Sequence, residues 1–71
     1  MTPIVSAITD ARSARKAQAH FRNRSILSKI TRDGYTKLSL FVPKDWHPDY
    51  ALKMLRLQLP TSARYFIEPG P

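Results

Sequence analysis

Residues 35–42 read YTKLSLFV, and this stretch decides how the rest of the chain is interpreted. Its side chains alternate between two faces, Thr36, Leu38, Leu40 and Val42 on one and Tyr35, Lys37, Ser39 and Phe41 on the other. Alternation with β-branched and aromatic residues predicts a strand with one buried face, formed by Leu38, Leu40 and Val42. Pro43 predicts its end, because proline has no N–H to donate to a sheet.

The chain after this strand predicts a helix and a short closing strand. In KDWHPDYALKMLRLQLP, residues 44–60, Pro48 suits the first helical turn and Asp49 its positive end. Pro60 predicts the stop of this amphipathic helix. Residues 62–69, SARYFIEP, alternate again and predict a second, shorter strand.

The chain before residue 35 predicts helix. Apolar residues follow a spacing of three and four, at Ile4, Ala7, Ile8, Ala11, Ala14, Ala17 and Phe21. Ser6 or Thr9 is a candidate cap for this helix. Beyond Phe21 the apolar face turns, so two interpretations stay open: one long helix, or two helices broken near Asn23. Gly34 is placed to end the helical region.

These elements predict an α+β fold: a small single domain with a basic N-terminal helix or helix pair, one strand, one amphipathic helix and a short C-terminal strand. Residues 1–71 form one domain, and we expect residues 1–5 and 69–71 to fray. A lone strand is unstable, so it must pair with the C-terminal segment or with its twin in a homodimer.

Composition excludes several kinds of site. The chain has no cysteine and only two histidines, which argues against disulfides and a structural metal centre. No nucleophile–base pair, carboxylate pair or glycine-rich phosphate loop is present, so we expect neither an enzyme nor a cofactor nor a small-molecule substrate. The absence of a long apolar run predicts no signal peptide, no membrane span and a cytoplasmic location, in the host cytoplasm if the protein is viral.

The strongest positive signal is a basic run. The net charge is +7, and the segment from residue 11 to residue 32 has no acid and holds seven cations: Arg12, Arg15, Lys16, Arg22, Arg24, Lys29 and Arg32. Arginine makes forked contacts to phosphate and carboxylate. The run is therefore interpreted as contact to nucleic acid or to an acidic protein surface, with a solvated helix face as the ordinary alternative.

The strand adds a second candidate contact. YTKLSLFVPKDWHPDYALKML resembles the strand-then-helix opening of the ribbon-helix-helix family of small DNA-binding proteins, of the phage and plasmid kind, over residues 35–59. The resemblance implies a dimer whose paired strands enter the major groove, with Lys37 and Ser39 as the base-reading residues.

Two functions follow. The first is a small nucleic-acid-binding protein that acts on DNA or RNA, in particular a DNA-binding transcriptional regulator. The alternative is a small phage-type interaction protein that docks on an acidic surface of a larger host protein, such as RNA polymerase or a nucleic-acid-handling complex, and inhibits or modulates it. Trp46 and Tyr50 are candidate protein-interface residues.

Overall fold

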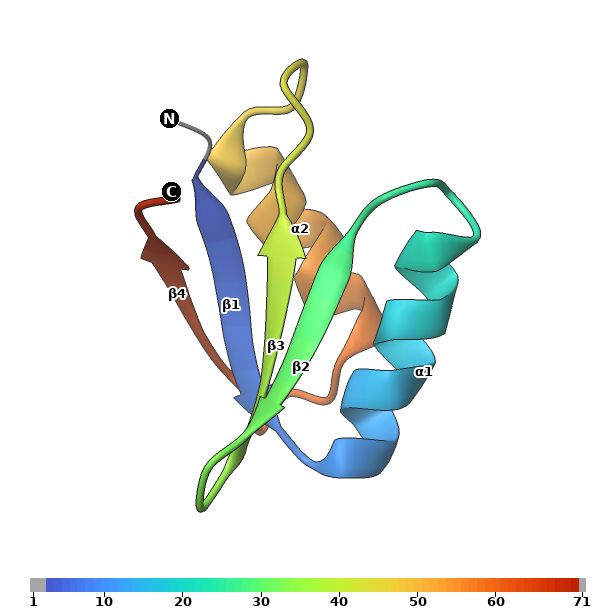
Figure 1. Cartoon of the computed structure of the whole chain (residues 1–71), viewed down its shortest axis with the longest axis vertical. Helices are drawn as coiled ribbons and strands as arrows, with labels where there is room; N and C mark the ends of the chain where they lie inside the picture. Colours follow the sequence, from blue (N-terminus) through green and yellow to red (C-terminus); the bar gives the residue numbers. More distant parts are fainter. Residues whose placement is uncertain (1–2, 71) are drawn as a thin grey trace.

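The computed structural model describes residues 3–70 and contains two helices and four strands (Figure 1). In chain order the elements are β1 (Ile4–Thr9), α1 (Ala11–Arg22), β2 (Ser28–Arg32), β3 (Thr36–Phe41), α2 (Pro48–Gln58) and β4 (Arg64–Glu68). The α+β class predicted from the sequence is confirmed, while the arrangement of elements differs from the prediction.

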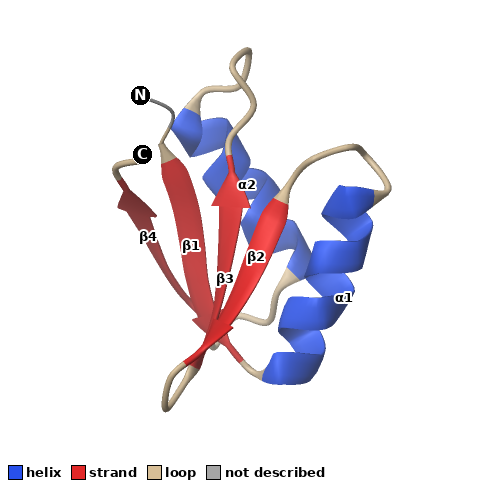
Figure 2. Cartoon of the chain, viewed as in Figure 1, coloured by secondary structure: helices blue, strands red, loops and turns tan. Residues whose placement is uncertain are grey.

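The four strands form one antiparallel sheet in the order β2-β3-β1-β4. Both helices pack on one face of this sheet and leave the other face uncovered (Figure 2). The β-α-β-β-α-β connectivity is the split βαβ, or ferredoxin-like, arrangement. A fold of this kind hosts many functions, so function has to be argued from side chains.

The core lies between the sheet and the helices. Val5, Ala7, Leu38 and Leu40 point from β1 and β3 toward the helices and are fully buried, as expected for strands with alternating faces. The helices contribute five more fully buried side chains, Ala14, Ala17, Phe21, Ala51 and Leu55. Alanines at these positions let α1 lie close to the sheet, and Phe21 is the largest of the fully buried side chains.

Three predicted elements are present. The strand after Tyr35 runs from Thr36 to Phe41 with the predicted buried face. The following helix begins at Pro48, behind a His47 N-cap whose Nδ1 accepts from the Asp49 backbone N–H at 3.1 Å. The closing strand is β4, Arg64–Glu68.

The predicted helix over residues 4–9 is wrong, because this segment is β1. The sequence IVSAIT is apolar or small at nearly every position, so it fits a period of two as well as a spacing of three and four. The pairing of β1 with both β3 and β4 buries Val5 and Ala7 completely, which selects the strand. Ile4 and Val5, which we expected to fray, are paired in β1; residues 1, 2 and 71 lie outside the described residues.

The cap of α1 also differs from the prediction, since neither Ser6 nor Thr9 fills it. Asp10 is the N-cap, and its Oδ2 accepts from the Ser13 backbone N–H at 2.9 Å. Hydrogen bonds from Ser13, through its side chain and then its backbone, hold the pKa of the exposed Asp10 carboxyl below its ordinary value. The helix therefore begins where its first free N–H groups meet a carboxylate.

Neither a continuous helix nor a second helix after Asn23 is found. Asn23 is the C-cap of α1, and Ser25 N–H and Ile26 N–H donate to the carbonyls of Arg22 and Phe21. This bond pair, with Ser25 in the left-handed region at φ 60°, is a Schellman ending in which serine takes the usual place of glycine. The chain then turns into β2, which carries Ile30 to the edge of the core.

Gly34 does not end a helix. It lies in the turn between β2 and β3 with φ 76°, a conformation that glycine adopts without strain. This hairpin gives β3 its first partner, and β1 is its second. Because both edges of β3 are bonded within the chain, it needs neither the C-terminal segment nor a second copy to complete its pairing.

Candidate functional site

Of the seven basic residues predicted to contact an anionic partner, five lie together on the outside of the helical layer. Ala14, Ala17 and Phe21 mark the buried side of α1, and the exposed side carries Arg12, Arg15, Lys16 and Arg22. Arg24 follows in the exposed turn after the helix. We call these five residues the α1 patch.

No acidic side chain neutralises the α1 patch within residues 3–70. The ion pairs found in this part of the chain are Lys37–Glu68 and His47–Asp49, and neither involves the patch. The nearest carboxylate in sequence, that of Asp10, is occupied as the helix cap. The patch is therefore a concentration of positive charge directed at solvent, which favours an anionic partner.

The N-terminal half of the patch destabilises its own helix. Arg12 lies in the first turn of α1, where the helix dipole is positive and where α1 has no acid. Arg15 and Lys16 stand three and four residues further along, so both repel Arg12 across one turn. The repulsion among these three cations lowers the stability of α1, and a polyanion bound to them would screen that repulsion.

The C-terminal half of the patch is better accommodated. Arg22 lies in the last turn, where the helix dipole favours a cation. Arg24 Nη1 lies 3.3 Å from the His20 carbonyl oxygen, to which it donates, and 3.3 Å from His20 Nδ1. This contact holds the Arg24 guanidinium at the end of α1 instead of leaving it fully free.

The structure separates the other predicted contact residues from the α1 patch. Lys29 faces solvent on the uncovered side of the sheet, opposite Ser39 in the register of β2 and β3. Arg32 is exposed at the end of β2, and its register with Thr36 places it on the face that the helices cover. The predicted seven-residue run is therefore divided between two sides of the molecule.

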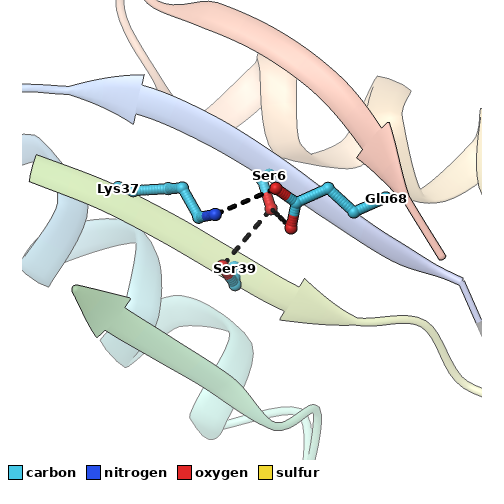
Figure 3. Close-up of polar contacts among 4 residues, drawn as sticks. All are labelled: Ser6, Lys37, Ser39 and Glu68. Carbon is cyan, nitrogen blue, oxygen red and sulfur yellow. Dashed lines mark hydrogen bonds and ion pairs between the residues drawn. The ribbon is translucent and has the colours of Figure 1, made fainter. Parts of the chain in front are cut away.

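Lys37 and Ser39 lie on the uncovered face but are engaged within the chain (Figure 3). Lys37 Nζ lies 2.9 Å from Glu68 Oε1, with 22% and 33% of the two side chains exposed. The Ser6 hydroxyl lies 3.3 Å from both Glu68 Oε2 and the Ser39 hydroxyl, and Ser39 is only 7% exposed. Two groups expected to read bases are thus parts of a polar network across β1, β3 and β4.

Trp46 and Tyr50 form an edge-to-face pair with ring centroids 4.8 Å apart. Trp46 packs partly buried against the core, whereas Tyr50 is exposed on α2. The pair steadies the entry to α2, and Tyr50 is its more exposed member.

Sequence reasoning missed a hollow at one end of the sheet. It has a volume of about 370 Å³ and lies between the loops that follow α1 and β3, lined by Ser25, Ile26, Leu27, Phe41, Val42, Pro43 and Lys44. The one feature of the sequence that pointed to this hollow was Phe41, a large apolar residue on the polar face of its strand. The wall formed by Ser25, Ile26 and Leu27 could not be predicted, because residues 23–27 were expected to be helical and are a loop.

Two classes of site find no support in residues 3–70. Nowhere in this range do three or more His, Cys, Asp or Glu side chains gather to hold a metal ion. Neither α1 nor α2 has the length and apolar character that crossing a membrane requires. No protein-family model matches the sequence, and no curated protein sequence matches it significantly.

Proposed function

We propose that this chain binds nucleic acid and that the α1 patch holds the phosphates. The observation that carries the proposal is the set of five exposed cations on one helix and its closing turn, without an acidic partner in the described residues. Four of the five are arginines, whose planar guanidinium binds phosphate oxygens in pairs.

The size of the patch supports the same proposal. The 12 residues of α1 extend about 18 Å at 1.5 Å per residue. Phosphates of one DNA strand rise by about 3.4 Å per step along the helix axis, so this length corresponds to about five steps. Four cations lie within that length and Arg24 follows it, so the spacing of positive charge is close to that of the phosphates along one strand.

The test is the salt dependence of binding to a 20-base-pair duplex, measured by fluorescence anisotropy. We expect affinity to fall steeply between 50 and 200 mM salt, because each phosphate contact releases counterions. Arg12→Gln combined with Lys16→Gln should reduce the slope of log K against log salt by about 1.8, since each contact contributes about 0.9. Because both changes relieve repulsion in α1, weaker binding cannot be attributed to unfolding.

The matched control removes one lysine and one arginine from the uncovered face of the sheet. Lys29 and Arg64 are both exposed there, so Lys29→Gln with Arg64→Gln makes the same change in net charge. We expect the control to alter the slope by less than half as much as the patch variant. Equal effects would assign binding to net charge alone. Absence of any complex at 20 mM salt, with the duplex and with a single strand of the same length, would refute the proposal in favour of a protein partner.

A further inference from the structure

The hollow at the end of the sheet begins at the residue that follows the α1 patch in the chain. One wall is the loop after α1 and the other is the chain after β3; both loops lie at the end of the sheet where β3 finishes (Figure 1). Ser25, which lines the hollow, follows Arg24 of the patch. The register places Leu27 and Phe41 on the uncovered side of the sheet, so a flexible strand whose phosphates lie along α1 has to pass the C-terminal end of the helix and turn round the edge strand β2 to reach them.

The wall of the hollow is apolar and partly uncovered. Leu27 is 76% exposed and Phe41 is 36% exposed, although both are large apolar side chains. The Phe41 backbone N–H donates to the Leu27 carbonyl at 3.0 Å, which fixes Leu27, just before β2, beside Phe41 at the end of β3. An exposed aromatic ring beside an aliphatic side chain offers a surface on which a flat ring can stack.

The wall is also held in place and bears the appropriate charge. Ser25 and Ile26 are fixed by two hydrogen bonds to the last turn of α1, so the loop is formed before any ligand arrives. Lys44 is the charged residue among those that line the hollow, and no acid lines it. A phosphate beside a stacked base would meet Lys44 at the wall of the hollow.

We infer that this hollow takes an unpaired base of the nucleic acid that the α1 patch holds, so that the ligand is single-stranded DNA or RNA. The inference rests on the proposed function. A base inside a duplex is stacked on its neighbours and cannot enter, whereas an unpaired base stacks on an aromatic ring without sequence preference. A second copy of the chain fits less well, since it would bring the same cations to this surface without an acid to meet them.

The test compares a ten-residue oligothymidine with an abasic oligomer of the same length and charge, and repeats the comparison with oligouridine. Wild type should bind the base-bearing oligomers at least about tenfold more tightly than the abasic one. Phe41→Leu keeps an apolar side chain but removes the ring, and it should abolish most of this difference while leaving abasic binding unchanged. Leu27→Ser, at an exposed position where folding is not at risk, should reduce the difference as well.

Phe66→Leu is the matched control, because Phe66 is a partly exposed phenylalanine on β4 that does not line the hollow. It should leave the preference for bases intact. Equal affinity of wild type for base-bearing and abasic oligomers overturns the inference but not phosphate binding by α1. The same holds if Phe66→Leu loses as much of the preference for bases as Phe41→Leu does. Failure to bind any of the oligomers overturns the inference, and it overturns the proposed function as well if the 20-base-pair duplex is not bound either.

Discussion

Replacement of Arg12 by glutamine should stabilise the folded protein while it weakens nucleic-acid binding. Arg12 stands in the first turn of α1, next to the positive end of the helix, with no acid in that turn. Arg15 and Lys16 follow at the two spacings where helical side chains meet. The variant removes three unfavourable interactions at once and leaves the buried side of the helix unchanged.

The expected gain is about 1 kcal/mol in the free energy of unfolding at low salt. A cation at the N-terminal end of a helix costs about 0.3–1 kcal/mol, and each like-charge pair costs about 0.2–0.5 kcal/mol. Arginine and glutamine have nearly the same helix propensity, so that quantity does not change the balance. For a domain of this size, 1 kcal/mol raises the melting temperature by about 5 °C.

The assay is urea unfolding followed by far-ultraviolet circular dichroism, at 20 mM and at 1 M sodium chloride. With a slope of about 1 kcal/mol per molar urea, the midpoint should rise by about 1 M at low salt. At 1 M salt, where charges more than about 3 Å apart are screened, most of the gain should vanish.

Arg22→Gln is the control on the same helix, because Arg22 lies in the last turn, where the dipole favours a cation. This variant should lower stability by a few tenths of a kcal/mol. The reasoning is refuted if Arg12→Gln is neutral or destabilising at low salt, or if its gain survives unchanged at 1 M salt.

Three further predictions concern the helix ends and the polar network. Asp10→Ala should lower the melting temperature at pH 7, because α1 loses its N-cap acceptor. Since the pKa of Asp10 is lowered in the folded state, wild type loses this stabilisation as the pH falls below about 4. The melting temperatures of wild type and Asp10→Ala should therefore converge in acid, and a difference that stays constant with pH would contradict the role of Asp10 as the N-cap. Ser25→Gly should add about 0.5–1 kcal/mol in urea unfolding, because glycine carries no Cβ at φ 60°, and a loss of stability would show that the serine is unstrained. Glu68→Gln should lower the free energy of unfolding by about 0.5 kcal/mol, which is in the range of partly exposed ion pairs. A double-mutant cycle with Lys37→Met should give a coupling energy of that size. The absence of coupling at low salt would mean that the Lys37–Glu68 contact contributes nothing.

Local pattern was sufficient for some elements and misleading for others. β3 and α2 were predicted because their periodicity is clean and proline marks their limits at Pro43, Pro48 and Pro60. IVSAIT in β1 satisfies two periods at once, and SKITR in β2 is too short and too polar for either. For those two segments the pairing partner decides, and each pairs with β3. Val5 pairs with Leu40, which lies 35 residues further along the chain, and Ser28 pairs with the same Leu40, 12 residues further along.

The sequence alone determined the α+β class, the central strand with its buried face, the second helix, and a basic segment without acids. These follow from side-chain periodicity, proline positions and charge, all of which act within a few residues. Only the tertiary structure decided that five cations share the outside of α1 and the turn after it, that Lys37 and Ser39 are engaged with Glu68 and Ser6, and that Leu27 and Phe41 border one hollow. The physical reason is that sheet register joins residues tens of positions apart, and it is register that assigns each side chain to a face.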